Sequence, residues 1–449
     1  MKQSRAFFND SKMHYKVLAL AFPMIVSNIT TPLLGLVDTA VLGHLDQAHY
    51  LAGVAFGSMV LTLLFWLLGF LRMSTTGLVA QALGAKDNDK QLHILGQGLL
   101  LALVFALLIV ALQDVWLGAA AYFSNPSALV LGAAKDYYGI RVYSAPFSLM
   151  NLVFLGWLLG RHHPKAAMYS VVLANLLNLG LDLYLVLVLK WGVKGAAWAS
   201  LVAEIGSFML LASFTLTTIR QQLSARWQQL WLNLQPKAML QLMSLNRDIF
   251  IRSLCLQAAF SFMTFKAANI GELELAANAI LLNFLMLTAY ALDGFAYSAE
   301  AMVGKGVGAK DKHQVKQAVN YSLLWSLLAS LGFSLVFLGF GEAILGAMTS
   351  ITEVQQTALV YLPWLVWMPL LAVTCYLFDG VYIGAAKGQV MRDSMLVSSL
   401  GVFFPVWHWL NLDYGNHALW GALTLFMLAR GITLAGHYYI SMANDRFIR

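Results

Sequence analysis

The chain has 449 residues, of which 60% are hydrophobic and only 11% are charged, and its net charge is +7. Soluble domains are about 25% charged, so this composition offers too few polar side chains to cover a water-exposed surface. It excludes a soluble enzyme, a nucleic-acid-binding protein and a disordered scaffold, and it predicts an all-α integral membrane protein. The two cysteines, Cys255 and Cys375, lie in apolar runs and form neither a metal-binding nor a disulfide pattern.

Apolar windows long enough to cross a bilayer as a helix, about 20 residues, occur twelve times. The windows lie near residues 15–42, 51–80, 92–115, 132–159, 166–189, 195–217, 238–268, 274–302, 317–341, 355–385, 393–411 and 417–442. The first window is too long for a signal peptide, contains Asp38 and lacks a cleavage-like ending, so we expect it to be retained.

The basic residues predict the orientation of these spans. With twelve spans, the two termini and every second connection lie on one side of the membrane, and 20 of the 28 Lys and Arg residues fall there. The opposite connections contain only Lys190 and Lys194. Because cytoplasmic loops of membrane proteins are enriched in Lys and Arg, both termini are expected in the cytoplasm, and the positive charge needs no nucleic acid as partner.

An internal repeat divides the chain into two halves. Identical residues recur at a constant offset of 224 positions. The repeated residues are Leu51-Ala52 and Leu275-Ala276, Gly84-Ala85-Lys86-Asp87 and Gly308-Ala309-Lys310-Asp311, Gly156 and Gly380, Gly160 and Gly384, and Ser170 and Ser394. The repeat predicts a lobe at 1–219, a cytoplasmic linker at 220–236 and a second lobe at 237–449.

Six spans per lobe give both lobes the same orientation, so a pseudo-two-fold axis along the membrane normal should relate them. Such a duplication is typical of transporters, in which a cleft between the lobes opens alternately to either side. Some channels are duplicated as well, and the repeat alone leaves carrier and channel open.

Asp38 is the strongest candidate for a functional residue in the first span. A charge in the middle of a span costs about 2.5–3.5 kcal/mol, and charged residues in spans are therefore often functional. Pro23 and Pro32 precede Asp38, and each removes a backbone hydrogen bond, so this helix should be able to bend. The acid beside a potential hinge suggests a protonation switch.

The fifth span places three polar residues on one face. Asn175, Asn178 and Asp182 fall within a 60° stripe at about 100° per residue, and such a stripe must face protein or water. A hydrogen-bonded seam between helices would explain the stripe structurally. A carboxylate with two amide neighbours favours a site for a proton or another cation, which Asn151, Ser200 and Glu204 could complete.

The second lobe does not repeat this cluster. The 224-residue offset places Cys375, Ser399, Val402 and Val406 at the positions of Asn151, Asn175, Asn178 and Asp182. The second lobe instead contains Asp293, Glu300 and Asp379 within its spans. These acids are secondary candidates, either as ion-pair partners of residues such as Arg252 or as groups that recognise a cation. We therefore expect the coupling ion to bind in the first lobe.

These residues resemble the MATE (multidrug and toxic compound extrusion) transporters, in particular their DinF-like branch. The resemblance covers nearly the whole chain. It rests on Pro23, Val37-Asp38-Thr39, Gly84-Ala85-Lys86-Asp87, Tyr137-x-x-x-Arg141, Pro146, Asn151, Asn178-x-x-x-Asp182, Gly192-x-x-Gly195-Ala196-Ala197-Trp198-Ala199-Ser200 and Asp379-Gly380.

The resemblance implies cation-coupled export by alternating access. It implies a first-lobe cation site at Asp38, Asn178 and Asp182, with Asn151, Tyr137 and Ser200 around it, and a bend of the first span at Pro23. The NorM-like branch uses a seventh-span Glu for sodium, whereas the corresponding region here begins Arg252-Ser253-Leu254 and contains no acid. A sodium site of that type is therefore not expected.

The predicted function is an antiporter of the bacterial inner membrane that exports organic, mostly cationic, drug-like compounds against H⁺ or, as the second choice, Na⁺. A flippase of lipid-linked or amphipathic substrates is the main alternative, and a channel is a weaker one. An enzyme is not expected, because the sequence shows no nucleophile–base or metal constellation. We expect no cofactor, a monomer and no macromolecular partner other than the lipid bilayer.

Overall fold

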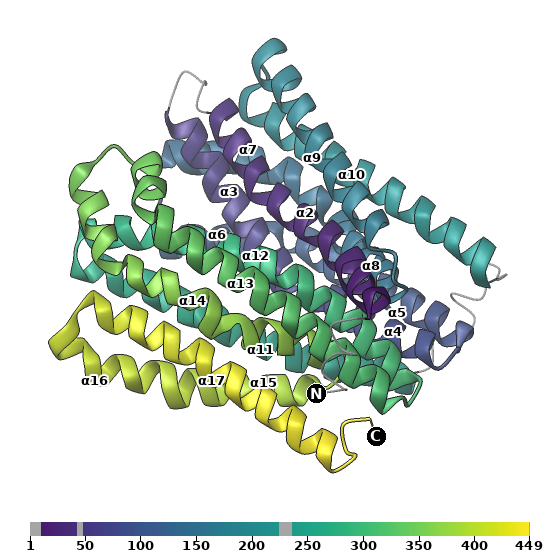
Figure 1. The fold of residues 1–449 in the computed structure, drawn as a ribbon. Coiled ribbons are helices and arrows are strands. Elements are labelled where there is room, and N and C mark those ends of the chain that lie inside the picture. Colours follow the sequence, from purple (N-terminus) through teal and green to yellow (C-terminus); the bar gives the residue numbers. More distant parts are fainter. Residues whose placement is uncertain (1–9, 43–47, 224–235, 449) are drawn as a thin grey trace. The chain divides into compact units, whose positions relative to one another are not determined.

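The computed structural model describes residues 10–42, 48–223 and 236–448. For residues 31–40, 42, 48, 222–223, 236–239 and 241, it describes the backbone alone. All regular elements in these residues are helices (Figure 1). Eleven of the helical stretches with described side chains are long and apolar enough to cross a membrane. Helix α2 (Ser11–Leu42), with 32 residues, coincides with the predicted first span. The predicted all-α membrane fold with twelve spans is confirmed.

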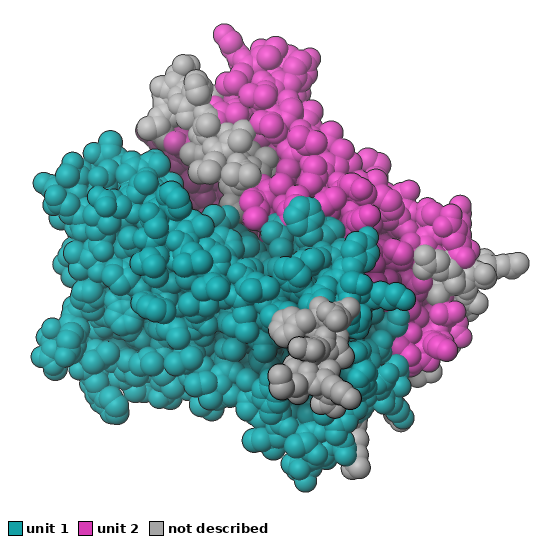
Figure 2. Space-filling model, in the orientation of Figure 1, with its two compact units in different colours: residues 1–25, 243–449 teal, residues 26–242 magenta. Residues whose placement is uncertain are grey.

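The chain forms two compact units (Figure 2). Unit 2 comprises Val26–Leu242. Its helices after α2 are α3 (Ala48–Leu67), α4 (Phe70–Gly84), α5 (Asn88–Ala111), α6 (Gln113–Ser124), α7 (Ala128–Arg141), α8 (Ala145–Gly160), α9 (Pro164–Asp182) and α10 (Gly192–Thr218). Short helical segments η1 (Val142–Ser144), η2 (Leu183–Val188) and η3 (Ile219–Leu223) continue α7, α9 and α10.

Unit 1 comprises Met1–Ile25 and Met243–Arg449. Its helices are α11 (Pro236–Ile270), which begins in unit 2, α12 (Glu272–Gly308), α13 (Lys312–Met348), α14 (Thr352–Gly384), α15 (Gly388–Ser398), the segment η5 (Ser399–Phe403), α16 (Phe404–Tyr414) and α17 (Asn416–Ala443).

Helix α2 is divided between the two units after Ile25. Its first half packs within unit 1, where Nε1 of Trp325 on α13 donates a hydrogen bond to Nδ1 of His14 (3.1 Å). The repeat assigned this segment to the lobe at 1–219, so the division by contacts differs from the division by sequence. Most of the predicted linker, 220–236, lies outside the described residues.

Helix α13 shows why these helices suit a membrane. Its buried side includes four serines spaced four residues apart, whereas Leu335, Leu338 and Phe340 are more than half exposed. The serines are Ser322, Ser326, Ser330 and Ser334. Small residues allow neighbouring helices to approach closely, and exposed large apolar side chains are stable against lipid. A helix on the surface of a soluble protein has the opposite distribution, with apolar side chains buried and polar ones exposed.

The internal repeat is present in the helix contacts of each unit. A Cβ atom added to Gly156 on α8 would lie under 3.0 Å from the Arg72 carbonyl oxygen on α4. A Cβ atom added to Gly380 on α14 would also lie under 3.0 Å from the Ala296 carbonyl oxygen on α12. Gly380 follows Gly156, and Ala296 follows Arg72, by the same 224 positions. Gly160 and Gly384 repeat the pattern against Thr76 and Glu300. Glycine is therefore required here by close helix packing rather than by backbone conformation.

The repeated tetrapeptides form the same turn in both units. Lys86 and Lys310 have positive φ angles of 58° and 55° and end their helices. Asp87 and Asp311 then cap the next helix, because their side chains accept hydrogen bonds from the backbone N–H groups of Lys90 (2.9 Å) and Gln314 (3.0 Å). The repeat in sequence is thus a repeat of helix–turn–helix geometry.

Candidate functional site

Asn178 and Asp182 form a hydrogen-bonded pair inside unit 2. They are 4% and 3% exposed, and the Asn178 side-chain Nδ2 donates to Asp182 Oδ2 at 2.9 Å. The two residues are four positions apart on α9, a spacing that places side chains on the same helix face. Asp182 is the last residue of α9, and the π-helical segment η2 begins directly after it. Such segments are rare in helices and frequent at functional sites.

Helix α10 supplies a third member of this group. Asn178 Nδ2 also donates to the Ser200 hydroxyl on α10 (3.4 Å), and α9 and α10 lie side by side (Figure 1). The amide thus bridges a carboxylate on its own helix and a hydroxyl on the neighbouring one. The structure brings together three of the predicted site residues, which we call the Asp182 cluster: Asn178, Asp182 and Ser200.

Tyr137 lies in an apolar cluster rather than in a hydrogen-bonded network. It is 5% exposed and packs with side chains of α2, α3, η2 and α10. This valine–tyrosine cluster consists of Val41, Val54, Ala133, Tyr137, Val186, Val193, Ala196 and Ala197. Val186 follows Asp182 by four residues and Ala196 precedes Ser200 by four. The cluster therefore covers the Asp182 cluster one helical turn away, at the η2 end of α9.

Asn151 belongs to a second polar group in unit 2. Its Nδ2 donates to the side-chain Oε2 of Glu204 (3.1 Å) and to the backbone carbonyl of the same residue (3.3 Å). Arg141 Nη2 lies 3.6 Å from Glu204 Oε1, and Arg141 Nη1 donates to the Ser144 hydroxyl. The group, which we call the Glu204 cluster, joins α7, η1, α8 and α10. Asn151 and Glu204 were both candidates to complete the site on α9, and in the structure they bond to each other.

The two groups are connected along α10. Ser200 and Glu204 are four residues apart, one helical turn or about 6 Å along the axis. Asn175, the third member of the predicted stripe, is half-buried, and its Nδ2 atom has no hydrogen-bond partner among the described residues. The stripe on α9 therefore separates into the bonded pair Asn178–Asp182 and the separate Asn175.

Two of the predicted residues lie on α2. The side chain of Asp38 is outside the described residues, although its backbone is helical. Position 38 is one turn before Val41, a member of the valine–tyrosine cluster. Pro23 is buried within the helix and lies two residues before the boundary between the units. As a proline, it leaves the Ala19 carbonyl without its usual helical donor.

The second-lobe acids occupy different environments in unit 1. Asp379 on α14 accepts hydrogen bonds from Arg252 on α11 and from Arg430 on α17, the latter at 2.6 Å. These three side chains are 90% or more buried. On α12, Glu300 is completely buried, and Asp293 is partly exposed. Arg252 was one possible ion-pair partner of the second-lobe acids, and in the structure it pairs with Asp379.

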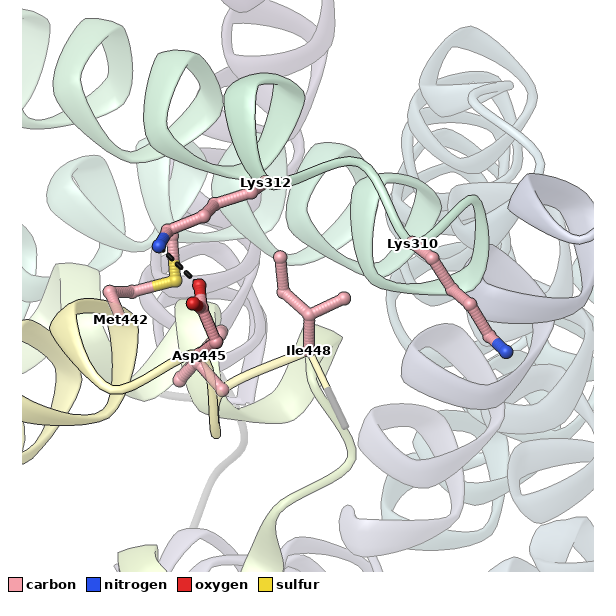
Figure 3. Close-up of a pocket in the computed structure, with 6 residues that line it drawn as sticks. Lys310, Lys312, Met442, Asp445 and Ile448 are labelled. Carbon is pink, nitrogen blue, oxygen red and sulfur yellow. Dashed lines mark hydrogen bonds and ion pairs between the residues drawn. The ribbon is translucent and has the colours of Figure 1, made fainter.

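Unit 1 has a cavity of about 470 Å³ whose lining includes none of these residues (Figure 3). Its lining residues are Lys310, Lys312, Met442, Asp445, Phe447 and Ile448. The Lys312 ammonium donates to Asp445, whereas the Lys310 side chain points away from this pair (Figure 3). The sequence analysis proposed none of these residues as a site.

Glu204 was a candidate to complete the site on α9, whereas Ser144 was not predicted as a functional residue. Arg141 entered only through the motif Tyr137-x-x-x-Arg141, and in the structure it pairs with Glu204. The signal was present in the sequence, because Arg141 and Glu204 both lie within apolar spans, where opposite charges are expected to pair.

Buried polar clusters inside a twelve-span, two-lobe helical membrane protein are typical of a multi-pass membrane transporter, and this is the class of this chain. The MatE family model matches residues 23–184 and 249–407. The chain is 45% identical over 423 residues to DNA damage-inducible protein F of Escherichia coli, covering 93% of this chain and 90% of the relative. The chain belongs to the MatE family.

Two further comparisons agree. A probable multidrug resistance protein NorM of Synechococcus is 24% identical over 452 residues, covering 96% of this chain and 93% of that protein. A crystal structure of MATE in the straight conformation matches with a TM-score of 0.87 and 19% identity, covering 96% and 97% of the two chains. The match to that structure shows the twelve-helix fold.

Proposed function

We propose that this protein exports organic cations in exchange for protons and that the Asp182 cluster, together with Asp38, carries the exchanged proton. The buried Asn178–Asp182 pair is the observation that supports this most directly. A buried carboxylate is costly when ionised, and taking up a proton removes that cost. The same carboxylate can attract a cationic substrate when the proton has left, so proton and substrate compete.

The sequence position of Asp38 relative to Val41 supports including Asp38 in the proposed site. The valine–tyrosine cluster contains Val41, three residues beyond Asp38, together with Val186 and Ala196, each four residues from a member of the Asp182 cluster. Three residues or four residues correspond to about one helical turn in each case. We therefore include Asp38 in the proposed site with Asp182 and Ser200, since all three positions are about one turn from members of the valine–tyrosine cluster.

Pro23 provides the proposed hinge. A proline inside a helix removes one backbone hydrogen bond and favours a bend. In this chain, the helix passes from unit 1 to unit 2 two residues after Pro23. A bend of α2 at that point would move position 38 and so couple proton binding to a conformational change.

The substrate class and the location complete the proposal. A carboxylate site is complementary to positive charge, and the NorM relatives are named as probable multidrug resistance proteins. The bias of Lys and Arg toward the termini and alternate connections supports cytoplasmic termini and insertion in the bacterial inner membrane. The direction of transport is then from the cytoplasm outward, driven by entering protons.

The test is efflux of ethidium from preloaded right-side-out membrane vesicles with an imposed pH gradient, acidic outside, or, separately, an inward sodium gradient. Asp182→Asn and Asp38→Asn keep the side-chain volume and remove the titrating group. We expect gradient-driven efflux to fall at least about tenfold in both, at unchanged protein level, because the competing proton has no site. Asp136→Asn is the matched control, since Asp136 on α7 is 57% exposed and pairs with Lys194.

Full efflux by Asp182→Asn under a pH gradient would contradict the proposed proton site. Efflux driven by the sodium gradient and not by the pH gradient would replace the proton by Na⁺ as the coupling ion. Movement of ethidium independent of either gradient would favour a channel, and transport of a fluorescent lipid without ethidium efflux would favour a flippase.

A further inference from the structure

The Glu204 cluster contains a second carboxylate in unit 2 that the proposed mechanism does not use. The Glu204 side chain is 29% exposed. Its carboxylate accepts a hydrogen bond from the Asn151 amide at 3.1 Å, and the Arg141 guanidinium lies 3.6 Å from it. An ion pair at 3.6 Å, with an Arg141 side chain that is 16% exposed, is a loose contact. Glu204 is therefore partly buried, and its ion pair with Arg141 is not tight.

We propose that Glu204 is a second proton carrier of the first lobe, which exchanges its ion pair with Arg141 for a proton. The proposal rests on the proposed function, since it adds a second proton to the same exchange. In the described state, Glu204 is ionised and paired with Arg141. In the alternative state, one carboxyl oxygen binds a proton, the ion pair opens and the carboxyl group is neutral.

The structure contains the acceptor that the protonated state needs. A protonated carboxyl group has an O–H donor, which must find a partner when it is buried. Asn151 is 5% exposed, and its Oδ1 atom has no hydrogen-bond partner among the described residues. The same amide already contacts Glu204 through Nδ2. Rotation of the Asn151 amide would present Oδ1 to the new O–H group without moving either helix.

The structure also contains the partner that Arg141 needs when the ion pair opens. Arg141 Nη1 donates to the Ser144 hydroxyl on η1, one turn beyond Arg141. This contact does not involve Glu204. The guanidinium therefore keeps a hydrogen bond in both states, and its partial exposure allows water to solvate the charge.

Few other ionisable groups compete for this role. The helices packed against α10 include α7, α8 and α9. Helix α8 contains no charged or titratable side chain. The ionisable groups on the other elements that contact α10 are Lys135, Asp136, Tyr137, Tyr138 and Arg141 on α7, Tyr143 on η1, Lys165, Tyr169 and Asp182 on α9, Tyr184 on η2, Arg220 on η3, and His49 and Tyr50 on α3. Asp182 bonds to Asn178, and Arg141 is the basic group in contact with Glu204.

The Asp182 and Glu204 carboxylates are connected through α10, because Ser200 of the Asp182 cluster and Glu204 are one helical turn apart on that helix. Each has its own amide, Asn178 or Asn151. Two separate carboxylates with separate amides can each bind a proton. The consequence is that binding of one cationic substrate should displace about two protons rather than one.

The experiment counts protons released when ethidium binds to the purified full-length protein in weakly buffered detergent solution, with a pH-indicator dye as readout. The wild type should release about two protons per ethidium, and Glu204→Gln and Asp182→Asn about one each. Glu204→Asp keeps the titrating group and should restore a second proton. Glu342→Gln, an exposed acid on α13, is the control and should release as many as the wild type.

The outcomes separate this inference from the proposed function. Two protons from both the wild type and Glu204→Gln would overturn the role of Glu204 and leave proton coupling intact. One proton from the wild type and none from Asp182→Asn would do the same. Ethidium binding without proton release in the wild type would overturn the proposed coupling and the inference with it, as would no binding of ethidium.

A second variant guards against misfolding of Glu204→Gln. Asn151→Leu removes the acceptor Oδ1 and leaves the carboxylate in place. If the acceptor stabilises the protonated state, this variant should release about one proton at neutral pH and recover the second at lower pH. An unchanged proton count over the whole pH range would contradict the proposed use of Asn151.

Discussion

At the scale of single residues, Asp379 shows how the second lobe treats an intramembrane acid. It accepts hydrogen bonds from two arginines, Arg252 and Arg430, and all three side chains are 90% or more buried. The Arg430 guanidinium additionally lies 5.4 Å from the Phe426 ring centroid. A carboxylate held by two fixed cations in this way balances buried charge. We therefore interpret Asp379 as a structural residue rather than as a cation-binding group.

This interpretation predicts a stability defect for Asp379→Asn. The substitution leaves two buried guanidinium groups without their carboxylate, and breaking a buried ion pair from one side costs about 3–5 kcal/mol. The thermal midpoint in detergent and the folded yield should both fall. Asp393→Asn is the control, because Asp393 is 62% exposed and its ion pair with Arg392 should contribute at most about 1 kcal/mol. A normal midpoint with an altered substrate range would instead assign Asp379 to substrate recognition.

Asp182 differs from Asp379 in the groups that hold it. Its contacts described above are to the amide of Asn178, which in turn reaches the hydroxyl of Ser200. Two guanidinium groups hold Asp379 in its ionised form, because charge-assisted hydrogen bonds are stronger than those from a neutral amide. The contrast between these two buried acids is the residue-level reason for placing proton exchange in the first lobe.

At the scale of helices, close packing against glycine fixes one helix pair in each unit. Gly156 and Gly160 allow α8 to approach α4, and Gly380 and Gly384 allow α14 to approach α12. Helices in a membrane gain no hydrophobic free energy from leaving the lipid, so close backbone approach and van der Waals contact stabilise their association. Replacing one of these glycines by a larger residue should therefore destabilise the α4–α8 pair and the α12–α14 pair in the same way.

Gly384→Ala should separate α14 from α12. The new Cβ would collide with the Glu300 carbonyl oxygen, a backbone atom that cannot rotate away. Overpacking of this kind costs about 1–3 kcal/mol or more, and thermal unfolding in detergent should report a lower midpoint. Gly332→Ala on α13 is the control, because a Cβ there meets nothing within 4 Å. Gly160→Ala should have a similar effect in unit 2, whereas equal midpoints for Gly384→Ala and Gly332→Ala would contradict the packing argument.

At the scale of the whole molecule, the distribution of basic residues determines the expected orientation. The helices at 49–84, 88–111 and the later spans confirm the positions of the connections from which the orientation was inferred. The turns around Lys86 and Lys310 therefore belong to the same side as the termini. Each turn therefore serves two purposes. Lys86 and Lys310 contribute to the charge bias that predicts the orientation, and Asp87 and Asp311 cap the following helices.

Reporter fusions test this orientation. Fusions after Asp87, Asp311 and Arg449 should report a cytoplasmic location, because Lys and Arg near span ends oppose translocation. Fusions after Gly271 and Asp413 should report the external side. An external signal after Asp311 together with a cytoplasmic signal after Gly271 would contradict the twelve-span topology with internal termini.

The sequence by itself determined the fold and one local part of the site. Apolar length predicts spans because lipid cannot satisfy backbone hydrogen bonds, so each crossing must be a helix of known minimum length. The constant offset predicted two similar lobes, and the repeated glycine contacts bear this out. The pair Asn178–Asp182 was predictable because both residues lie on one helix, where spacing alone places them on one face.

The tertiary structure decided the pairings between helices. Asn151 bonds to Glu204 instead of Asn178 because α8 and α10 meet at that level, and no spacing within one helix contains this information. Arg252 bonds to Asp379 across 127 positions for the same reason. Polar side chains in a membrane must find partners, but the register and rotation of the neighbouring helices determine which partner is within reach.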